Sequence, residues 1–330
     1  METDFDAGFV LPPGSIVIAG PTAAGKSEIA LALAEELGGE IVSVDSMQVY
    51  RGLDIGTAKP DKQERSDIPH HLIDVVEVHE TFNVARYVRL AREAIAQIQA
   101  RERVPILCGG SGLYFRALLE GLGQAPASDP LLREQLEQTP LSQLLRELAE
   151  RDRVIFEQID RNNRRRVMRA VEVIRLTGRT YSAQRADWEL KQPEPLMGTF
   201  IGLSRISNDL RQRIDARVEA MFQNGLVEET EALLQRGLAQ NCTALQALGY
   251  KQVAEYLRGE RSQSETIELV KIRTRQFAKR QMTWFKRQMQ LHWIQLGPDK
   301  EKNFDNVRAF LDQRAHNKGE QLARDGSEKK

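Results

Sequence analysis

The chain has 330 residues, with 47 Lys and Arg, 47 Asp and Glu, and a formal net charge of zero. This length suits one α/β domain with a second unit, and a neutral chain is not expected to coat nucleic acid uniformly, although it can carry a locally basic face. The only cysteines, Cys108 and Cys242, are far apart, which argues against a disulfide framework or structural zinc. An acidic N-terminus and the lack of a membrane-length apolar run predict a soluble, cytoplasmic protein.

The first predicted elements are a buried strand at 15–19 and a helix in which Ile29, Leu33 and Leu37 recur every four residues. The residues between them fit the phosphate-loop pattern G-x-x-x-x-G-K-[ST]: Gly20-Pro21-Thr22-Ala23-Ala24-Gly25-Lys26-Ser27. Backbone N–H groups of such a loop bind a polyphosphate or diphosphate, to which Lys26 adds a positive charge. The hydroxyl of Ser27 can ligate Mg²⁺, so we expect Mg²⁺ as the cofactor. The loop alone does not identify ATP as the ligand.

Two further strands, at 41–44 and 104–108, each end in a residue type that can do chemistry. Asp45 follows the first, and Ser111 lies in the glycine-rich turn after the second. Alternating strands and helices predict a parallel sheet, and ligands bind beyond the carboxyl ends of such strands. Asp45 is then a metal ligand, a general base or a helix cap. Ser111 is either a cap or part of a turn whose glycines let a ligand approach the backbone.

The character of the sequence changes after residue 122. From 126 to about 195 only helical patterns occur, and a strand at 199–203 returns the chain to the core. A helix beginning at 207–209 and a long basic helix at 264–290 follow, before a strand at 291–296. We therefore expect a phosphate-loop α/β core at 1–122 and 198–313, an inserted helical domain at 123–197 and a disordered tail at 314–330.

Two helices carry clustered cations. Arg164, Arg165, Arg166 and Arg169 begin one helix, where positive charge opposes the macrodipole, so they are either a solvated face or the binding site of an anion. The second set lies between 271 and 287 with no acidic residue among them: Lys271, Arg273, Arg275, Lys279, Arg280, Lys286 and Arg287. In a neutral chain this indicates contact with a phosphate backbone or a diphosphate. His70 and His71 form no metal-binding or catalytic pattern, and we expect a structural role.

Several motifs together resemble the tRNA dimethylallyltransferase family, also called tRNA isopentenyltransferases. They occur in the family's order and span residues 15–296. They read GPTAAGKS, VDSMQVYRGLDIGTAKP, PHHLID, GGSGLYFRALLEG, NRRRVMRAVEV, ALGYKQ and TRQFAKRQMTWF. The chain lacks the C-terminal zinc finger of eukaryotic members and is similar to the bacterial type. The resemblance implies that the enzyme transfers a dimethylallyl group from dimethylallyl diphosphate to N6 of adenosine 37, beside the anticodon of tRNA.

The resemblance also implies roles for individual residues. Asp45 matches the general base, Ser111 matches a hydroxyl residue that is threonine in many members, and Arg213 matches an arginine that holds the diphosphate. The tRNA-binding residues that the resemblance implies are Asp45, Ser46, Met47, Gln48, Arg165, Arg166, Val167, Met168, Arg169, Gln246, Gly249, Tyr250 and Lys251. The implied partners are the anticodon stem-loop of tRNA and dimethylallyl diphosphate, and we expect a monomer.

Three other functions share parts of this pattern. A small-metabolite kinase uses the same loop and Mg²⁺ but leaves the two basic helices unexplained. A prenyltransferase acting on free adenine nucleotide needs less RNA-binding surface. If the chain were a non-catalytic, nucleotide-dependent RNA-binding protein, the position of Asp45 beside the phosphate loop would have no explanation.

Overall fold

The computed structural model describes residues 8–123, 125–184 and 198–327. The chain divides into a larger unit, Val10–Arg116 with Pro195–Lys330, and a smaller unit, Met1–Phe9 with Ala117–Glu194. Residues 123–194 of the expected insertion, 123–197, fall in the smaller unit, which begins earlier, at Ala117, inside a helix that starts at Gly112. The end of that insertion at 185–197, residues 1–7 and residues 328–330 of the expected tail lie outside the described residues.

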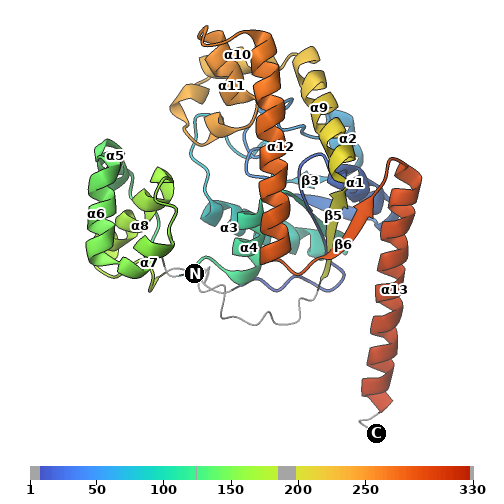
Figure 1. Cartoon of the computed structure of the whole chain (residues 1–330). Coiled ribbons are helices and arrows are strands. Elements are labelled where there is room, and N and C mark those ends of the chain that lie inside the picture. The colour runs from blue at the N-terminus through green and yellow to red at the C-terminus, as the bar shows by residue number, and fades with distance from the viewer. Residues whose placement is uncertain (1–7, 124, 185–197, 328–330) are drawn as a thin grey trace. The chain divides into compact units, whose positions relative to one another are not determined.

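A six-stranded parallel sheet forms the centre of the larger unit, in the order β3-β2-β4-β1-β5-β6. Figure 1 shows helices on both faces of this sheet. The predicted sheet flanked by helices is therefore confirmed. The strands are β1 (Ile16–Ala19), β2 (Gly39–Val44), β3 (His70–His71), β4 (Val104–Gly109), β5 (Thr199–Arg205) and β6 (His292–Leu296). The helices of this unit are α1 (Lys26–Leu37), α2 (Lys62–Asp67), α3 (Val84–Ala100), α9 (Ser207–Gln223), α10 (Leu226–Gln235), α11 (Tyr250–Leu257), α12 (Gln263–Gln288) and α13 (Lys300–Ser327), while α4 (Gly112–Glu120) crosses the boundary between the units.

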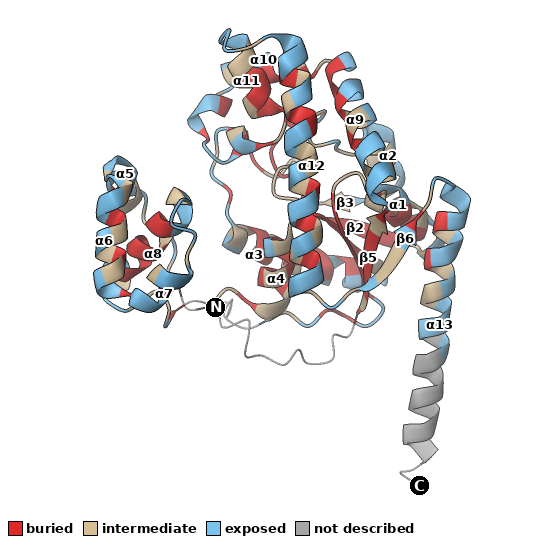
Figure 2. Ribbon diagram, viewed as in Figure 1, coloured by how far each residue is buried: buried red, intermediate tan, exposed pale blue. Residues whose placement is uncertain are grey.

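The strands are apolar on both faces because helices cover both. In β1, Ile16 and Ile18 join Ile29 and Leu33 of α1 in one core cluster, and the alternation of side chains directs Val17 to the opposite face. Figure 2 shows the buried strands and the buried inner sides of the surrounding helices. β1 lies between β4 and β5, so the phosphate loop that follows it is placed at the middle of the carboxyl edge.

The smaller unit is all-helical among its described residues. Its helices are α5 (Pro130–Gln138), α6 (Leu141–Arg151), α7 (Arg153–Gln158) and α8 (Arg164–Thr177). Leucines of α5 and α6 pack against the apolar side of α8, including Val167 and Met168, and form a separate core. This unit therefore has the hydrophobic centre that an independent domain needs.

The C-terminal segment contains the last helix of the described chain. Helix α13 continues through Ser327, past the expected start of the tail at 314. The stretch is rich in Ala, Arg, Gln, Glu and Lys, which lose little free energy in a helix, so the helix extends beyond the residues that pack on α1.

Candidate active site

A cavity of about 810 Å³ opens at the carboxyl edge of the sheet in the larger unit. The loops after β1, β2 and β4 contribute to its wall, together with α9, the segment before α11, and α12. Among its lining residues are Lys26, Ser27, Asp45, Ser46, Met47, Gln48, Ser111, Arg213, Arg217, Gln246 and Gln281. The structure thus brings together the phosphate loop, Asp45 and Ser111, as the strand ends predicted, and Arg213 joins them from α9.

The phosphate loop has a backbone shape that directs N–H groups into one place. Gly25 is left-handed, with φ 101°, and so is Ala23, with φ 62°, a conformation that a non-glycine residue adopts only when its surroundings fix it. The N–H groups of Ala23, Gly25, Lys26 and Ser27 make no hydrogen bond to another residue of the described chain. They form a nest for an anion at the N-terminus of α1.

Arginines hold the outer side of this loop through its carbonyl oxygens. Arg213 Nε donates to the oxygen of Ala23 at 3.1 Å, and Arg205 Nε donates to that of Ala24 at 2.9 Å. The guanidinium of Arg205 is buried and also binds Asp209, so its charge is neutralised. These bonds explain how Ala23 is kept in its strained conformation.

Lys26 lies at the bottom of the nest. Its Nζ donates to the oxygen of Pro21 at 2.7 Å. Burial lowers the pKa of the Lys26 ammonium to about 8, with Arg217 as a further lowering influence, whereas Cys108 and Asp45 raise it. Since an anion nearby favours the charged form of the amine, a diphosphate bound here would raise this pKa again.

Asp45 is held in place by one oxygen of its carboxylate. Its Oδ1 accepts a hydrogen bond from the N–H of Met47 at 2.8 Å and a longer one from that of Gln48 at 3.4 Å, which caps the turn after β2. Its Oδ2 makes no hydrogen bond to another residue of the described chain. One oxygen therefore fixes the carboxylate and the other is available to accept a proton from a ligand.

Ser111 and Gln48 connect the surrounding loops. Ser111 Oγ accepts from the N–H of Ser46 at 3.0 Å, which joins the loop after β4 to the turn of Asp45. Gln48 Oε1 accepts from the Ser43 hydroxyl at 2.8 Å, and its Nε2 donates to the oxygen of Thr57 at 3.3 Å. Both side chains are thus held at the cavity wall by neighbours.

The glycines beside Ser111 are required by the packing of neighbouring elements. A Cβ on Gly109 would lie 2.0 Å from the carbonyl oxygen of Val44, and on Gly110 it would lie 2.3 Å from Nε2 of Gln281. A Cβ on Gly112 would meet the ring of Trp284 at 2.2 Å. β2 and α12 pack directly on the backbone of this turn, and this packing requires glycine at these positions whether or not a ligand approaches.

Arg217 is a cavity residue that the sequence analysis missed. It lies one helical turn after Arg213 on α9, and burial lowers the pKa of its guanidinium while Asp45 raises it. One of its nitrogens approaches the oxygen of Thr57 at 3.4 Å. The four-residue spacing in Arg213-Ile214-Asp215-Ala216-Arg217 was the available signal, because residues i and i+4 share one side of a helix.

The segment before and within α11 divides into exposed and buried residues. Tyr250 is fully buried, and its hydroxyl donates to Glu229 at 2.5 Å and accepts from the N–H of Gly56 at 3.0 Å. The expectation that the Tyr250 side chain contacts tRNA therefore does not hold. Gly249 is also buried, whereas Gln246 is exposed and Lys251 is partly exposed.

The basic start of α8 is likewise only partly available to a ligand. Arg164 donates to three carbonyl groups at the end of α5, and Arg169 pairs with the buried Glu172 at 2.8 Å. Val167 and Met168 belong to the core of the smaller unit, so they are structural rather than RNA-contacting residues. Arg165 and Arg166 remain exposed.

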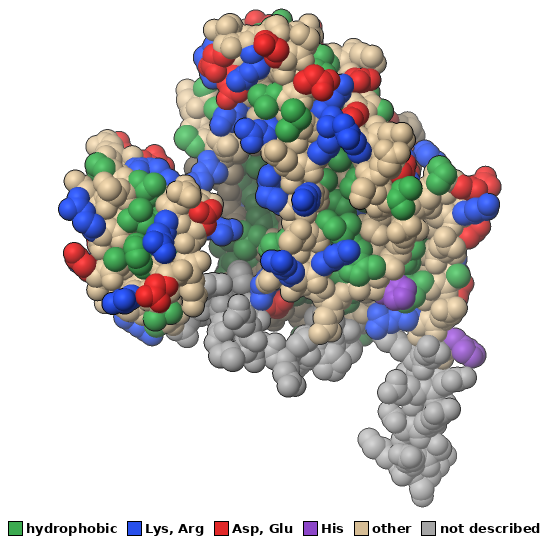
Figure 3. All heavy atoms as spheres, in the orientation of Figure 1, with side chains coloured by type: hydrophobic (Ala, Val, Ile, Leu, Met, Phe, Trp, Pro, Cys, Tyr) green, Lys and Arg blue, Asp and Glu red, His purple; other side chains and the backbone are tan. Residues whose placement is uncertain are grey.

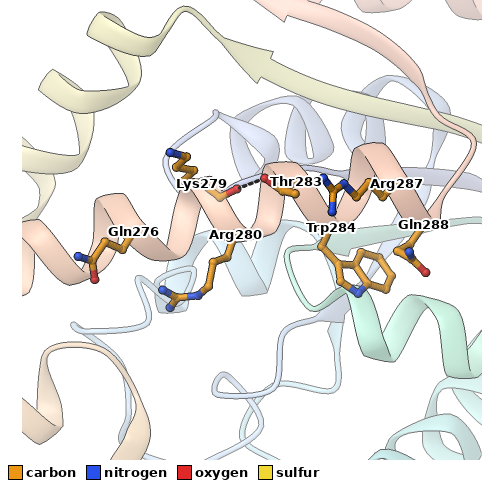
Figure 4. A pocket seen from close by; sticks show the side chains of 7 residues that line it. All are labelled: Gln276, Lys279, Arg280, Thr283, Trp284, Arg287 and Gln288. Atoms are coloured by element: carbon orange, nitrogen blue, oxygen red, sulfur yellow. Dashed lines mark hydrogen bonds between the residues drawn. The ribbon is translucent and has the colours of Figure 1, made fainter. Parts of the chain in front are cut away.

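Helix α12 changes character along its length. In its first half Lys271 pairs with Glu219 of α9 and with Glu268 of the same helix, and Arg275 pairs with Asp215 of α9, so these cations are neutralised. Lys279, Arg280 and Arg287 are exposed farther along, and Figure 4 shows them projecting from the helix together with Trp284. Figure 3 shows Lys and Arg side chains along the face where α12 runs. The second half is the basic surface of this helix.

The two histidines have the expected structural setting. His71 Nε2 lies 2.7 Å from the carboxylate of Glu40, which also receives two bonds from Arg101. The Arg101 bonds, followed by those of His71, lower the pKa of the Glu40 carboxyl despite its burial.

The oxygen ligands available in the cavity fit a Mg²⁺ ion whose coordination shell is completed by a bound phosphate and water. Among the described residues no cluster of three or more His, Cys, Asp or Glu would hold a metal ion. Ser27 lines the cavity beside the nest, and its hydroxyl makes no hydrogen bond to the rest of the described chain. Mg²⁺ commonly takes few protein oxygens and completes its shell with phosphate and water, so this arrangement suits it.

No helix in the described ranges is long and apolar enough to cross a membrane.

Comparisons with known proteins identify relatives of this chain. The IPP transferase family model matches residues 48–288. The chain is 45% identical over 281 residues to tRNA dimethylallyltransferase 1 of Citrifermentans bemidjiense, a match that covers 85% of this chain and 91% of the relative. The full-length tRNA isopentenylpyrophosphate transferase of Bacillus halodurans has a TM-score of 0.69 at 36% identity, covering 94% of this chain and 100% of that one. A eukaryotic dimethylallyltransferase acting on tRNA has a TM-score of 0.70 at 29% identity, over 86% and 74% of the respective chains.

Proposed function

Because the chain belongs to the tRNA dimethylallyltransferase (IPP transferase) family, it is a prenyl-transferring enzyme of tRNA modification, and we propose how it works. The donor is dimethylallyl diphosphate and the acceptor is the N6 amine of adenosine 37, beside the anticodon. The products are N6-dimethylallyladenosine and diphosphate. The observation that carries this proposal is the shared cavity in which the carboxylate of Asp45 lies with the anion nest and Lys26.

Asp45 acts as the general base. The lone pair of an adenine amine is delocalised into the ring, so the amine attacks carbon poorly unless its proton is removed. In the reaction the bond from N6 to C1 of the dimethylallyl group forms, the C1–oxygen bond breaks with its electron pair going to diphosphate, and the amine proton moves to Oδ2. Such proton transfer contributes ~10²–10⁴-fold to a rate.

The phosphate loop and its neighbouring cations stabilise the leaving group. Negative charge grows on the diphosphate as the C1–oxygen bond breaks, and fixed donors aimed at that charge lower the barrier. The N–H groups of 23 and 25–27, Lys26 and the half-buried Arg217 supply these donors. Ser27 would hold Mg²⁺, which neutralises diphosphate charge when bound.

RNA binding uses the exposed basic residues of both units. The target adenine must leave its stack to reach Asp45, at a cost of a few kcal/mol. Phosphate contacts by Arg165 and Arg166 on α8 and by Lys279, Arg280 and Arg287 on α12 offset that cost. Ser46, Met47, Gln48 and Gln246 line the cavity where the extruded base would lie.

One experiment separates this function from its rivals. The protein is incubated with Mg²⁺, dimethylallyl diphosphate labelled in its prenyl group, and either tRNA or AMP. We expect label in tRNA and none in AMP, with negligible ATP hydrolysis. Label in AMP alone would indicate an adenine-nucleotide prenyltransferase, and tRNA-stimulated ATP hydrolysis without prenyl transfer would refute the proposal.

A further inference from the structure

Gln281 of α12 bridges two loops of the cavity through its side-chain amide. Its Oε1 accepts a hydrogen bond from the N–H of Thr22 at 2.9 Å, and its Nε2 donates to the carbonyl oxygen of Gly110 at 2.9 Å. The residue is 8% exposed. Both ends of the amide are hydrogen-bonded, which fixes the orientation of the side chain. The two bonds also fix the position of one loop relative to the other.

The two loops carry the two halves of the proposed reaction. Thr22 precedes Ala23 in the loop that would bind the diphosphate. Gly110 precedes Ser111, whose hydroxyl accepts from the N–H of Ser46, the residue after Asp45. The amide of Gln281 therefore connects the diphosphate side of the cavity to the turn that holds the base.

Gln281 packs directly against the backbone of the glycine turn. Any side chain at Gly110 would collide with Gln281, because a Cβ there would lie 2.3 Å from Nε2. Three residues along α12, Trp284 covers Gly112 in the same way. Since residues i and i+3 lie on one side of a helix, this side of α12 rests on the whole glycine turn.

Gln281 also occupies the N–H group of Thr22, which is therefore not available to a ligand. The N–H of Thr22 donates to it, so Thr22 does not contribute its N–H to the anion nest, which is left to residues 23 and 25–27. The side chain consequently limits where along the loop a diphosphate can bind. A glutamine suits this place because it accepts and donates at once.

We propose that Gln281 is a positioning residue, which sets the distance between the diphosphate and Asp45 and thereby the geometry of prenyl transfer. This role rests on the proposed function. It is distinct from RNA binding, because the amide points to the two loops rather than to solvent. Misplacement of reacting groups by about 1 Å can cost ~10²-fold in rate.

The test compares Gln281→Leu with a matched control, Asn241→Leu. Asn241 is also a buried amide that bridges two segments, accepting from the N–H groups of Thr243 and Ala244 and donating to the oxygens of Val78 and Glu80. It does not line the cavity. We expect both variants to lower Tm, and only Gln281→Leu to lower kcat, by ~10–100-fold, with the Kd for tRNA unchanged.

Gln281→Glu provides a second readout that keeps the shape of the side chain. A carboxylate still accepts from Thr22 but faces the oxygen of Gly110 without a proton to donate. Burial raises the pKa of such a carboxyl group, and its protonated form restores the donor. The ratio of variant to wild-type kcat should therefore rise as pH falls.

These measurements separate two kinds of failure. Absence of prenyl transfer to tRNA by the wild-type protein would refute the proposed function and this role with it. Normal wild-type transfer, combined with kcat values of folded Gln281→Leu and Gln281→Glu within twofold of wild type, would refute the role of Gln281 alone. Should Gln281→Leu fail to fold, the pH dependence of Gln281→Glu decides.

Discussion

Arg213 and Ala23 are joined by a hydrogen bond across 190 residues of sequence, from Nε of the arginine to the carbonyl oxygen of the alanine, at 3.1 Å. The bond connects α9 to the phosphate loop at the residue with a left-handed backbone. The arginine that the sequence associated with the diphosphate therefore also holds the backbone of the loop that would bind it.

Arg213→Gln and Arg217→Gln are expected to differ. Loss of the Arg213 bond releases Ala23 and lowers both Tm and the affinity for prenyl diphosphate. Arg217→Gln removes a desolvated cation near Asp45, so KM for prenyl diphosphate should rise by ~10–100-fold, with a smaller change in Tm. Steady-state kinetics and thermal unfolding of both variants check this, and equal effects on both quantities would contradict the separate roles.

Asp45→Asn separates the role of Asp45 as a general base from its role as a cap of the turn after β2. Asparagine retains an oxygen for the N–H of Met47 but takes up no proton, so kcat should fall by ~10²–10⁴-fold while the Kd for tRNA changes little. Asp45→Ala loses the cap as well and should also lower Tm. Activity of Asp45→Asn within a few-fold of wild type would leave Asp45 as a cap alone.

The pH dependence of donor use should reflect Lys26. Its pKa is lowered to about 8, so the free enzyme carries the charge below that pH and loses it above. We expect kcat/KM for prenyl diphosphate to fall by about tenfold per pH unit above that value, whereas kcat stays level to higher pH because bound diphosphate raises the pKa. Lys26→Arg keeps its charge and should show no such inflection, although its activity is lower.

RNA binding by α8 can be tested without disturbing its core. Arg165→Gln with Arg166→Gln should weaken tRNA binding and flatten its salt dependence, by roughly 0.7–0.9 in slope for each phosphate that the variant no longer neutralises. Arg153→Gln, an exposed arginine of the same unit that pairs with Glu157, serves as the control and should leave the slope unchanged. Arg169 is left intact because its substitution would remove a partner of the buried Glu172. Equal slopes for the double variant and wild type would assign these arginines to a solvated surface.

Tyr250→Phe should act on stability rather than on RNA binding. The change removes the donor to Glu229 and the acceptor for Gly56, so the free energy of unfolding should fall by ~1–3 kcal/mol with an unchanged salt slope for tRNA. Tyr256→Phe on the same helix is the control, because the Tyr256 hydroxyl has no hydrogen-bond partner among the described residues. A Kd for tRNA that rises in Tyr250→Phe but not in Tyr256→Phe would restore the tRNA contact that the sequence predicted.

Local patterns predicted the cavity edge and all the described strands except β3, His70–His71. The strand expected at 104–108 is β4, Val104–Gly109, and the basic helix expected at 264–290 is α12, Gln263–Gln288. Asp45 and Ser111 line one cavity because strand ends in a parallel sheet meet at one edge. These features depend on residues close together in sequence.

What the sequence could not supply are contacts between distant residues. Nothing near Lys271 indicates that Glu219 neutralises it, and nothing near Gly110 indicates that Gln281 covers it. Family motifs also mark core and surface positions alike, so Val167 and Tyr250 were grouped with RNA-binding residues although both are buried. No element was assigned to α3, Val84–Ala100.

The strand order has a consequence for how the chain folds during synthesis. β1 pairs with β4 on one side and with β5, Thr199–Arg205, on the other, and the segment Ala117–Glu194 of the smaller unit is translated between β4 and β5. Until residue 205 leaves the ribosome, the apolar strand before the phosphate loop is an open edge whose backbone groups lack partners. An N-terminal fragment that ends before 199 should therefore aggregate, and the cavity can be completed only after Gln281 of α12, which lines it, has been translated.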